Sequence, residues 1–321
     1  MAGIRALLAA AMCLVSAGAF AQQQAYPAKP VRFVVAFAPG GPADLVARLI
    51  AQKIGDQWGQ QVIVENRGGA GGAVAAQAVA RAPADGYTVL VTTSSLAVTP
   101  ALNPNAGYDA EKDFIPVTLI ASSPNLFVAS TQSGIKTLRE AIDRAKSGKL
   151  NYGTAGAGTT PHLSAEYLFR VLGKVDVQHV PYKGAGPAMQ AVVAGETELA
   201  SVAISAGVPF VKGGRAVGLA VTSNKRVPAL PDVPTVAESG FGGFEDYTWV
   251  GLFVPAGTPP EIVARLNAEA QAALRSPEVR EKLAGAGFEP VGDGPREFAP
   301  YLRTELGKWA KVVKETGAKA E

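Results

Sequence analysis

The segment from Val31 to Asp44 places an apolar strand, a glycine-rich turn and the start of a helix in direct succession. A helix that begins right after such a turn leaves its first backbone N–H groups unpaired and carries the positive end of its dipole there. The glycines let a ligand approach this backbone without a side chain in the way. A second unit of the same kind runs from Leu150 to Pro161. The two units predict an α/β chain with two loops that favour anions.

The first 21 residues have the features of a signal peptide. Arg5 supplies the charged beginning, an apolar run extends to Phe20, and residues 19–21 fit an A-x-A cleavage site. The run is too short for a stable membrane span. The only cysteine, Cys13, lies inside this segment without the pattern of a lipidation site, so the mature chain has no disulfide. We therefore expect a protein exported to the periplasm.

Size and charge limit the classes of protein further. Removal of residues 1–21 leaves 300 of the 321 residues, more than one usual core, which indicates two lobes. Cleavage removes Arg5 and no acid, so the formal charge falls from +3 to +2. The Lys and Arg residues are scattered along the chain, so we expect neither nucleic acid nor an anionic membrane surface as a partner.

Short apolar runs alternate with helical periods along most of the chain, which predicts βαβ units with right-handed crossovers. The predicted strands are residues 31–37, 61–65, 87–92, 150–153, 177–181, 198–204, 216–222 and 248–254. Residues 259–286 and 295–316 are predicted to be helices without strands of their own, so we expect them to pack back onto the first lobe.

A segment rich in proline and glycine, from Val227 to Gly243, separates the middle of the chain from these C-terminal helices. We therefore assign residues 22–125 and 245–321 to lobe one and residues 126–244 to lobe two. The chain then crosses twice between the lobes, and the cleft between them is a favoured place for a ligand.

Catalytic, metal and nucleotide motifs have little support, so we expect no cofactor. Neither His162 nor His179 has a carboxylate or a second histidine at metal-ligand spacing. His179 alternates within a strand, whereas His162 lies in the first turn after the second loop, where it either donates to a ligand or packs against the helix. The chain has no G-x-S-x-G elbow and no P-loop, and residues 156–161 lack the last glycine of a dinucleotide fingerprint.

The two glycine loops remain the main candidates for ligand contact. Any single glycine could be present only to permit a tight turn. Because each predicted lobe has one such loop, we favour the interpretation that the two loops bind one anion between them. Asp44 is expected to stabilise the helix dipole and to pair with Arg48, because a carboxylate repels a bound anion. It could contact a ligand only through an amine, a hydroxyl or water. Ser94 and Ser95 follow a predicted strand and either reach the same cleft or lie in a surface loop.

An ordered set of short motifs extends over most of the chain: Tyr26-Pro27 with Lys29-Pro30, Pro39-Gly40-Gly41 with Asp44, Val64–Arg67, Ala84–Thr88, Tyr152–Thr159 with His162-Leu163, Val180–Gly184 and Leu230–Thr235. In this set the chain resembles the Bug-type (Bordetella uptake gene) substrate-binding proteins of tripartite tricarboxylate transporters. The resemblance implies an α/β, two-lobed periplasmic-binding-protein fold of type II-like form. Its lobes would close over a carboxylate held by loop amides and ordered waters.

The resemblance further implies a non-catalytic receptor that delivers a carboxylate to a membrane permease. We expect the receptor to be a monomer and the ligand to be a mono- or dicarboxylate with an aliphatic or aromatic body. The residues expected to contact the ligand are Phe37, Pro39, Gly40, Gly41, Asp44, Ser94, Ser95, Thr154, Gly156, Gly158, Thr159, His162 and Ser205. Relatives often have an aspartate where this chain has Val202, and Ser205 is the nearest polar group. This departure predicts a more apolar far end of the pocket and argues against an amino-acid ligand.

Two alternatives belong to other functional classes. The first is an exported hydrolase acting on a carboxylate or ester, with His162 as a base near Thr159 or Ser164. The second is a receptor that serves a signalling partner instead of a permease. The sequence does not separate this sensor from the transport receptor, whereas the resemblance favours a receptor over an enzyme.

Overall fold

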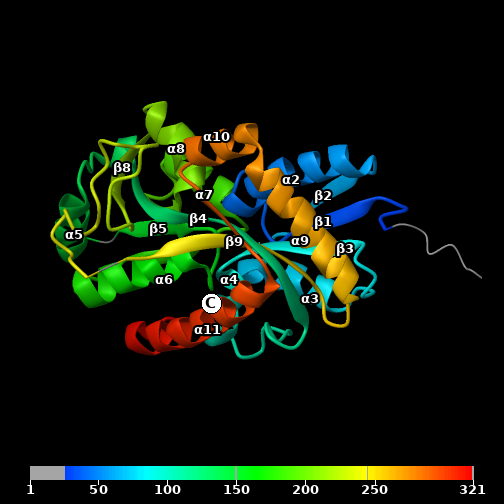
Figure 1. Cartoon of the computed structure of the whole chain (residues 1–321). Helices are drawn as coiled ribbons and strands as arrows, with labels where there is room; N and C mark the ends of the chain where they lie inside the picture. Colours follow the sequence, from blue (N-terminus) through cyan, green and yellow to red (C-terminus); the bar gives the residue numbers. More distant parts are fainter. Residues whose placement is uncertain (1–25, 149, 244, 320–321) are drawn as a thin grey trace, which may run out of the picture.

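The computed structural model describes residues 26–148, 150–243 and 245–319. The predicted signal peptide lies outside these residues. None of the helices in the described ranges is long and apolar enough to cross a membrane. The described residues form two lobes side by side, and the C-terminal part of the chain returns to the lobe of the N-terminal strands, where β9 pairs with β3 (Figure 1).

The elements follow one another in the order of an α/β protein. The first group comprises β1 (Val31–Val35), α2 (Pro42–Trp58), β2 (Val62–Asn66), η2 (Ala70–Gly72), α3 (Ala73–Ala80), β3 (Thr88–Thr93), α4 (Ser95–Leu102) and β4 (Phe114–Ser130). The second comprises η3 (Thr131–Ser133), α5 (Leu138–Ser147), β5 (Asn151–Thr154), α6 (Thr160–Glu166), η4 (Tyr167–Leu172), β6 (Gln178–Pro181), α7 (Ala185–Ala194), β7 (Leu199–Ala203), α8 (Ile204–Lys212) and β8 (Ala216–Val221). The third comprises β9 (Tyr247–Pro255), α9 (Pro260–Arg275), α10 (Pro277–Gly285), β10 (Glu289–Asp293) and α11 (Pro295–Thr316).

The strands follow the order β2-β1-β3-β9-β4-β7-β5-β6, with β8 and β10 also paired to β4. Strands β2, β1 and β3 are parallel, as are β6, β5 and β7. Strand β4 belongs to both lobes: residues 114–124 pair with β9, and residues 125–130 pair with β7 and β8. Strands β4 and β9 therefore form an antiparallel ribbon between the lobes (Figure 1).

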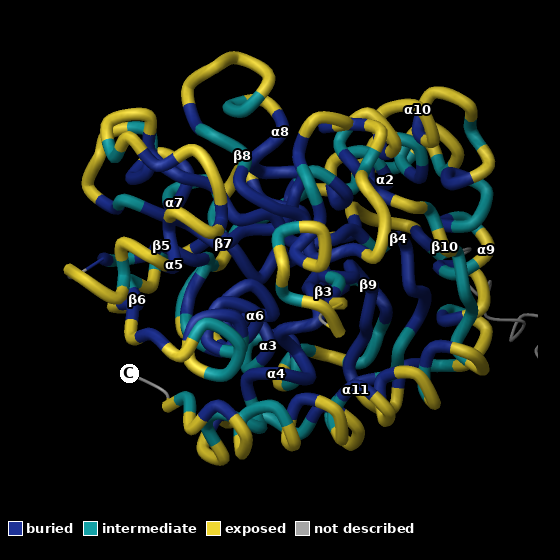
Figure 2. The backbone as a smooth tube through the Cα atoms, turned by 90° about the vertical axis from the view of Figure 1, so that its left-hand side faces the viewer, coloured by how far each residue is buried: buried dark blue, intermediate teal, exposed yellow. Residues whose placement is uncertain are grey.

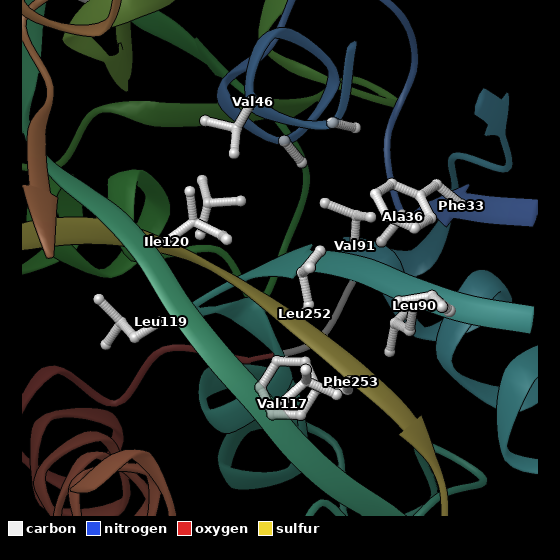
Figure 3. Packing of buried hydrophobic residues seen from close by; sticks show 14 of the residues in the cluster. Phe33, Ala36, Val46, Leu90, Val91, Val117, Leu119, Ile120, Leu252 and Phe253 are labelled. Carbon is white, nitrogen blue, oxygen red and sulfur yellow. The ribbon is translucent and has the colours of Figure 1, made fainter. Parts of the chain in front are cut away.

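Each lobe has its own hydrophobic core. In one, Phe33, Leu90, Val117 and Phe253 pack where β1, β3, β4 and β9 meet (Figure 3). In the other, alternate residues of β4 enter two different clusters, because successive side chains of a strand point to opposite faces. The buried interior and the exposed outer face of α11 stand out in Figure 2.

All eight predicted strands are present, within two residues at most of their ends. Two further strands were not predicted. Strand β4 contains Pro116 and Pro124, which argue against a strand, and its register shifts near the first of them. Strand β10 contradicts the expectation that the C-terminal part has no strand; it pairs with β4. The predicted helix 259–286 is two helices, because the extended Ser276 precedes Pro277 and ends the first.

Candidate functional site

The two lobes contact each other through glycine-rich loops. The Ala38 amide donates to the Lys183 carbonyl oxygen at 3.0 Å. A Cβ on Gly71 would lie 2.1 Å from the Ala157 carbonyl oxygen, and one on Gly186 would lie 2.4 Å from that of Pro39. Only glycine fits at these contacts, so the close approach of the lobes depends on the missing side chains.

Between the lobes lies a cavity of about 20 Å³. Its lining residues are Phe37, Pro42, Thr93, Ala155, Thr159, Pro161, Ala185, Ala203 and Thr248. None of these residues is charged. The volume is close to what one water molecule needs, so an organic ligand requires the lobes to move apart.

Three helices of eight or more residues begin at this cavity. Pro42 is the first residue of α2, Ala185 is the first residue of α7, and Ala203 is the residue before α8. No side chain caps any of these three N-termini. Their free N–H groups and the positive ends of their dipoles favour a negative charge. The cavity thus offers electrostatic stabilisation for an anion without a cationic side chain.

Asp44 organises the first loop from within. Its carboxylate accepts the Gly40 amide at 3.1 Å, the Asn66 amide at 3.0 Å and the Arg48 guanidinium at 2.9 Å. Burial acts to raise the pKa of Asp44, but the hydrogen bonds from Arg48, Asn66 and Gly40 outweigh it and lower the pKa. The predicted pair with Arg48 is confirmed. Because the Gly40 N–H is already bound to Asp44, the donors left for a ligand are at the start of α2.

The second loop is also held by its own side chains. Thr154 Oγ1 accepts the Gly156 amide at 3.1 Å and contacts His179 Nε2 at 2.7 Å. Thr159 Oγ1 donates to the Gly156 carbonyl oxygen at 2.8 Å and caps α6. His162 Nδ1 accepts the Gly158 amide at 3.4 Å. These contacts set the shape of the loop, and Thr159 alone among them lines the cavity.

His162 is buried and its ring stacks on His179, with centroids 4.1 Å apart. Burial, reinforced by the charge of Arg170, lowers the pKa of His162 to about 4. Both histidines line a separate cavity of about 620 Å³ beside the end of α11. Three charged groups of that cavity pair with one another, since Arg170 bridges Glu166 and Asp176. The His162 side chain therefore lies behind the second loop and lines this separate cavity, not the interlobe one.

A chain of buried hydroxyl groups joins the lobes next to the cavity. Ser94 Oγ lies 3.1 Å from Thr160 Oγ1, which lies 2.6 Å from Thr248 Oγ1. Thr248 Oγ1 donates to Asn125 Oδ1 at 2.6 Å, and Asn125 Nδ2 donates to Asp246 Oδ2 at 2.7 Å. Ser95 is bound to Thr93 in the same region.

The expected ligand contacts thus fall into three groups. Phe37 and Thr159 line the cavity. Pro39, Gly40 and Gly41 approach α7 of the other lobe, and Gly156 and Gly158 approach Gly71 and Thr99. The remaining expected contacts hold these loops or lie outside the lining: Asp44, Ser94, Ser95, Thr154, His162 and Ser205.

Sequence reasoning missed Thr93 and Thr248, which line the cavity from the ends of two strands. Their position at strand ends is the only signal that the sequence offers for them. Val202, where relatives often have an aspartate, packs in the core with Leu126 and Val128, and its neighbour Ala203 lines the cavity. The wall at this point is nevertheless apolar.

The arrangement expected of a hydrolase is not assembled in the described residues. Thr159 donates its hydroxyl proton to a carbonyl oxygen, and Ser164 donates to Asp246. His162 Nδ1 accepts a backbone amide. A nucleophile needs a base within hydrogen-bond reach, and neither hydroxyl has His162 as its acceptor.

A two-lobed α/β protein with uncapped helix ends around an uncharged interlobe cavity has the features of a solute-binding receptor. Comparison with known proteins specifies the family. The family described as "Tripartite tricarboxylate transporter family receptor" matches residues 46–318, and the chain belongs to this family. The resemblance to Bug proteins is confirmed by this match and by the similarity to a Bug relative.

That relative is Protein BugT of Bordetella pertussis, 35% identical over 298 residues, covering 92% of this chain and 91% of BugT. Two solved structures from Rhodopseudomonas palustris are also similar. Rpa4515 with adipate is 37% identical with a TM-score of 0.87, covering 91% of this chain and 98% of its own. MatC with bound malate is 38% identical with a TM-score of 0.85, covering 90% and 100%.

Proposed function

We propose that this chain is a non-catalytic extracytoplasmic receptor that binds a small organic carboxylate between its lobes and delivers it to a membrane permease. The observation that carries the proposal is the meeting of three uncapped helix N-termini at one cavity without charged side chains. A carboxylate suits such a site because backbone N–H groups can hold both of its oxygens. Two related structures hold dicarboxylates, adipate and malate.

Export to the periplasm and transfer to a permease are part of the same proposal. The N-terminal pattern of residues 1–21 supports export. Membership of a transporter-receptor family supports a permease partner. We further propose lobe boundaries near 125/126 and 244/245. The first of these falls within β4, where its pairing changes from β9 to β7 and β8.

The proposed binding residues act in different ways. Phe37 and Thr159 would contact the ligand directly, together with Thr93 and Thr248. Pro39, Gly40, Gly41, Gly156 and Gly158 would let the loops close over it. Asp44, Thr154 and His162 would hold the loops in shape.

A panel of carboxylic acids tests the proposal by thermal shift and calorimetric titration of the mature protein. A ligand that binds only the folded state raises the melting temperature. At least one acid of the panel is expected to bind and to be recovered unchanged. No binding by any mono- or dicarboxylate, or turnover of the bound acid, would contradict a carboxylate receptor.

The Gly71→Ala variant tests whether the binding site lies between the lobes. Its Cβ would meet the Ala157 carbonyl oxygen and hold the lobes apart, so ligand affinity should fall by roughly ten-fold or more. Gly59→Ala is a matched control, because Gly59 has nearly the same φ, 63° against 62°, and nothing within 4 Å of its Cβ position. Both variants carry the same backbone strain. Equal affinities of the two variants would place the ligand elsewhere.

A further inference from the structure

The three threonines that line the interlobe cavity have all committed their hydroxyl protons to the protein. Thr93 Oγ1 donates to Ser95 Oγ at 3.1 Å, and Thr159 Oγ1 donates to the Gly156 carbonyl oxygen at 2.8 Å. Thr248 Oγ1 donates to Asn125 Oδ1 at 2.6 Å. A hydroxyl has one proton and two lone pairs. These side chains can therefore accept a hydrogen bond from a ligand, but they cannot donate one.

Asp246 fixes the direction of the bonds at Thr248. Its carboxylate is buried, and an ionised carboxylate only accepts hydrogen bonds. The Asn125 amide must therefore turn its Nδ2 toward Asp246 and its Oδ1 toward Thr248. Thr248 then donates to Asn125 and has only lone pairs left.

The same constraint extends into the other lobe. Because the Thr248 proton is bound to Asn125, Thr160 must donate across the 2.6 Å contact to Thr248. Ser94 must in turn donate to Thr160. One buried charge thus orients hydroxyl groups from both lobes, and each group of this chain donates its proton to the next group on the way to Asp246.

We propose that Asp246 is a positioning residue that makes Thr248 an acceptor only, as Thr93 and Thr159 are through their own partners, so that the cavity selects carboxylates with a hydroxyl group over those with an oxo group. The inference rests on the proposed carboxylate site, where backbone N–H groups hold the carboxylate. A hydroxyl of the ligand can donate to a threonine oxygen. An oxo group in its place needs a donor, and no side chain among the described lining residues supplies one.

Calorimetric titration with matched acids tests this selection at pH 7.5. The pairs are lactate with pyruvate and 2-hydroxyglutarate with 2-oxoglutarate, which cover one and two carboxylates. The hydroxy acid of a pair is expected to bind roughly ten-fold more tightly, the usual effect of one unmatched buried polar group. If the oxo acid binds as tightly as the hydroxy acid or more tightly, the selection inference is wrong but the carboxylate receptor is not contradicted. The same holds if only acids with neither group bind. Failure of every carboxylate overturns both.

Two variants link the selection to the hydrogen-bond chain. In Asp246→Asn an amide, which can donate or accept, replaces the charge, so the hydroxy-to-oxo affinity ratio should fall to about three or less. The matched control, Glu245→Gln, removes the neighbouring exposed carboxylate and should keep the wild-type ratio. Thr248→Val should also lower the ratio, through weaker binding of the hydroxy acid. Unchanged ratios in both Asp246→Asn and Thr248→Val would exclude a role for this chain of bonds.

Discussion

Two buried aspartates act on different parts of the cavity wall, and their surroundings differ. Asp44 accepts from Arg48, Asn66 and the Gly40 amide, so the pKa of its carboxyl is lowered despite burial. Asp246 is also buried, but no partner stabilises its charge as strongly as Arg48 stabilises that of Asp44. Lys308 Nζ is 3.6 Å away, and burial raises the pKa of Asp246 to about 6. One carboxylate stabilises its loop, whereas the other is held at an energetic cost.

The difference shows that burial alone does not define the role of an acid. Asp44 gathers donors that the glycine loop would otherwise leave unpaired, which is a structural role. Asp246 determines the direction of a hydrogen-bond chain, and for that purpose its charge matters more than its contribution to stability. Buried charges kept at a cost are frequent at functional sites.

The largest expected effect comes from Asp44→Ala. The change leaves the Gly40 and Asn66 amides without their acceptor, so the free energy of unfolding should fall by about 2–3 kcal/mol. Ligand affinity should fall as well, because the first loop loses its internal support. Urea unfolding and calorimetry measure the two effects. Asp56→Ala on an exposed turn of the same helix is the control, and similar losses in both variants would show that Asp44 has no special role.

The dependence of stability on pH should differ in sign between the two sites. A lowered pKa means that Asp44 contributes stability above its unfolded pKa and loses it as the pH falls. The raised pKa of Asp246 means that its contribution is present below its unfolded pKa, near 4, and is lost as the pH rises through about 6. The Asp246→Asn variant should therefore gain up to about 3 kcal/mol relative to wild type between pH 4 and pH 7.

Urea unfolding at several pH values measures the free energy of unfolding of Asp246→Asn and Asp44→Asn. The Asp44→Asn variant should lose stability relative to wild type as the pH rises from 2 to 5. Slopes of the same sign in the two variants would refute the contrast between the two carboxylates. The two buried histidines do not interfere, because both variants keep them and the comparison is with the wild type at each pH.

The smallest effect is expected from Lys308→Met. Lys308 is the nearest cation to Asp246, so its loss should raise the pKa of Asp246 further. The lysine side chain is 42% exposed and screened by water, so stability at pH 7 should change by less than about 1 kcal/mol. Carboxyl titration by NMR measures the shift. Lys311→Met, on the exposed side of α11, should leave the pKa of Asp246 unchanged. A lower pKa of Asp246 in Lys308→Met would contradict an attractive interaction between Lys308 and Asp246.

Local patterns predicted most of the fold. Runs such as residues 31–37 and 87–92 are apolar, β-branched and bounded by turns, so each strand is specified by neighbouring residues. Strand β4 was not predicted because its prolines and polar residues are typical of a loop. Long-range pairing with β9, β7 and β8 supplies the hydrogen bonds that make it a strand.

The candidate site was less predictable for the same reason. The loops could be located because glycine turns before helices are local signals. The cavity wall also depends on Asn125, Thr248 and Asp246, whose hydrogen bonds join residues 121 and 123 positions apart. Nothing in the sequence near Asn125 indicates its partners, and the direction of their bonds depends on a charge that only the folded chain places beside it.

The ribbon of β4 and β9 has a kinetic consequence. Because β4 is hydrogen-bonded in both lobes, we expect their separation to be a rotation about this ribbon, the hinge type of motion. A rotation displaces residues least near its axis, so Asn125 and Thr248, on the ribbon itself, should stay almost in place while glycine contacts between the lobes, such as that of Gly186 with Pro39, separate. An arriving molecule would therefore meet one finished wall before the rest of the site assembles, and rejection can take place early, before the lobes have closed.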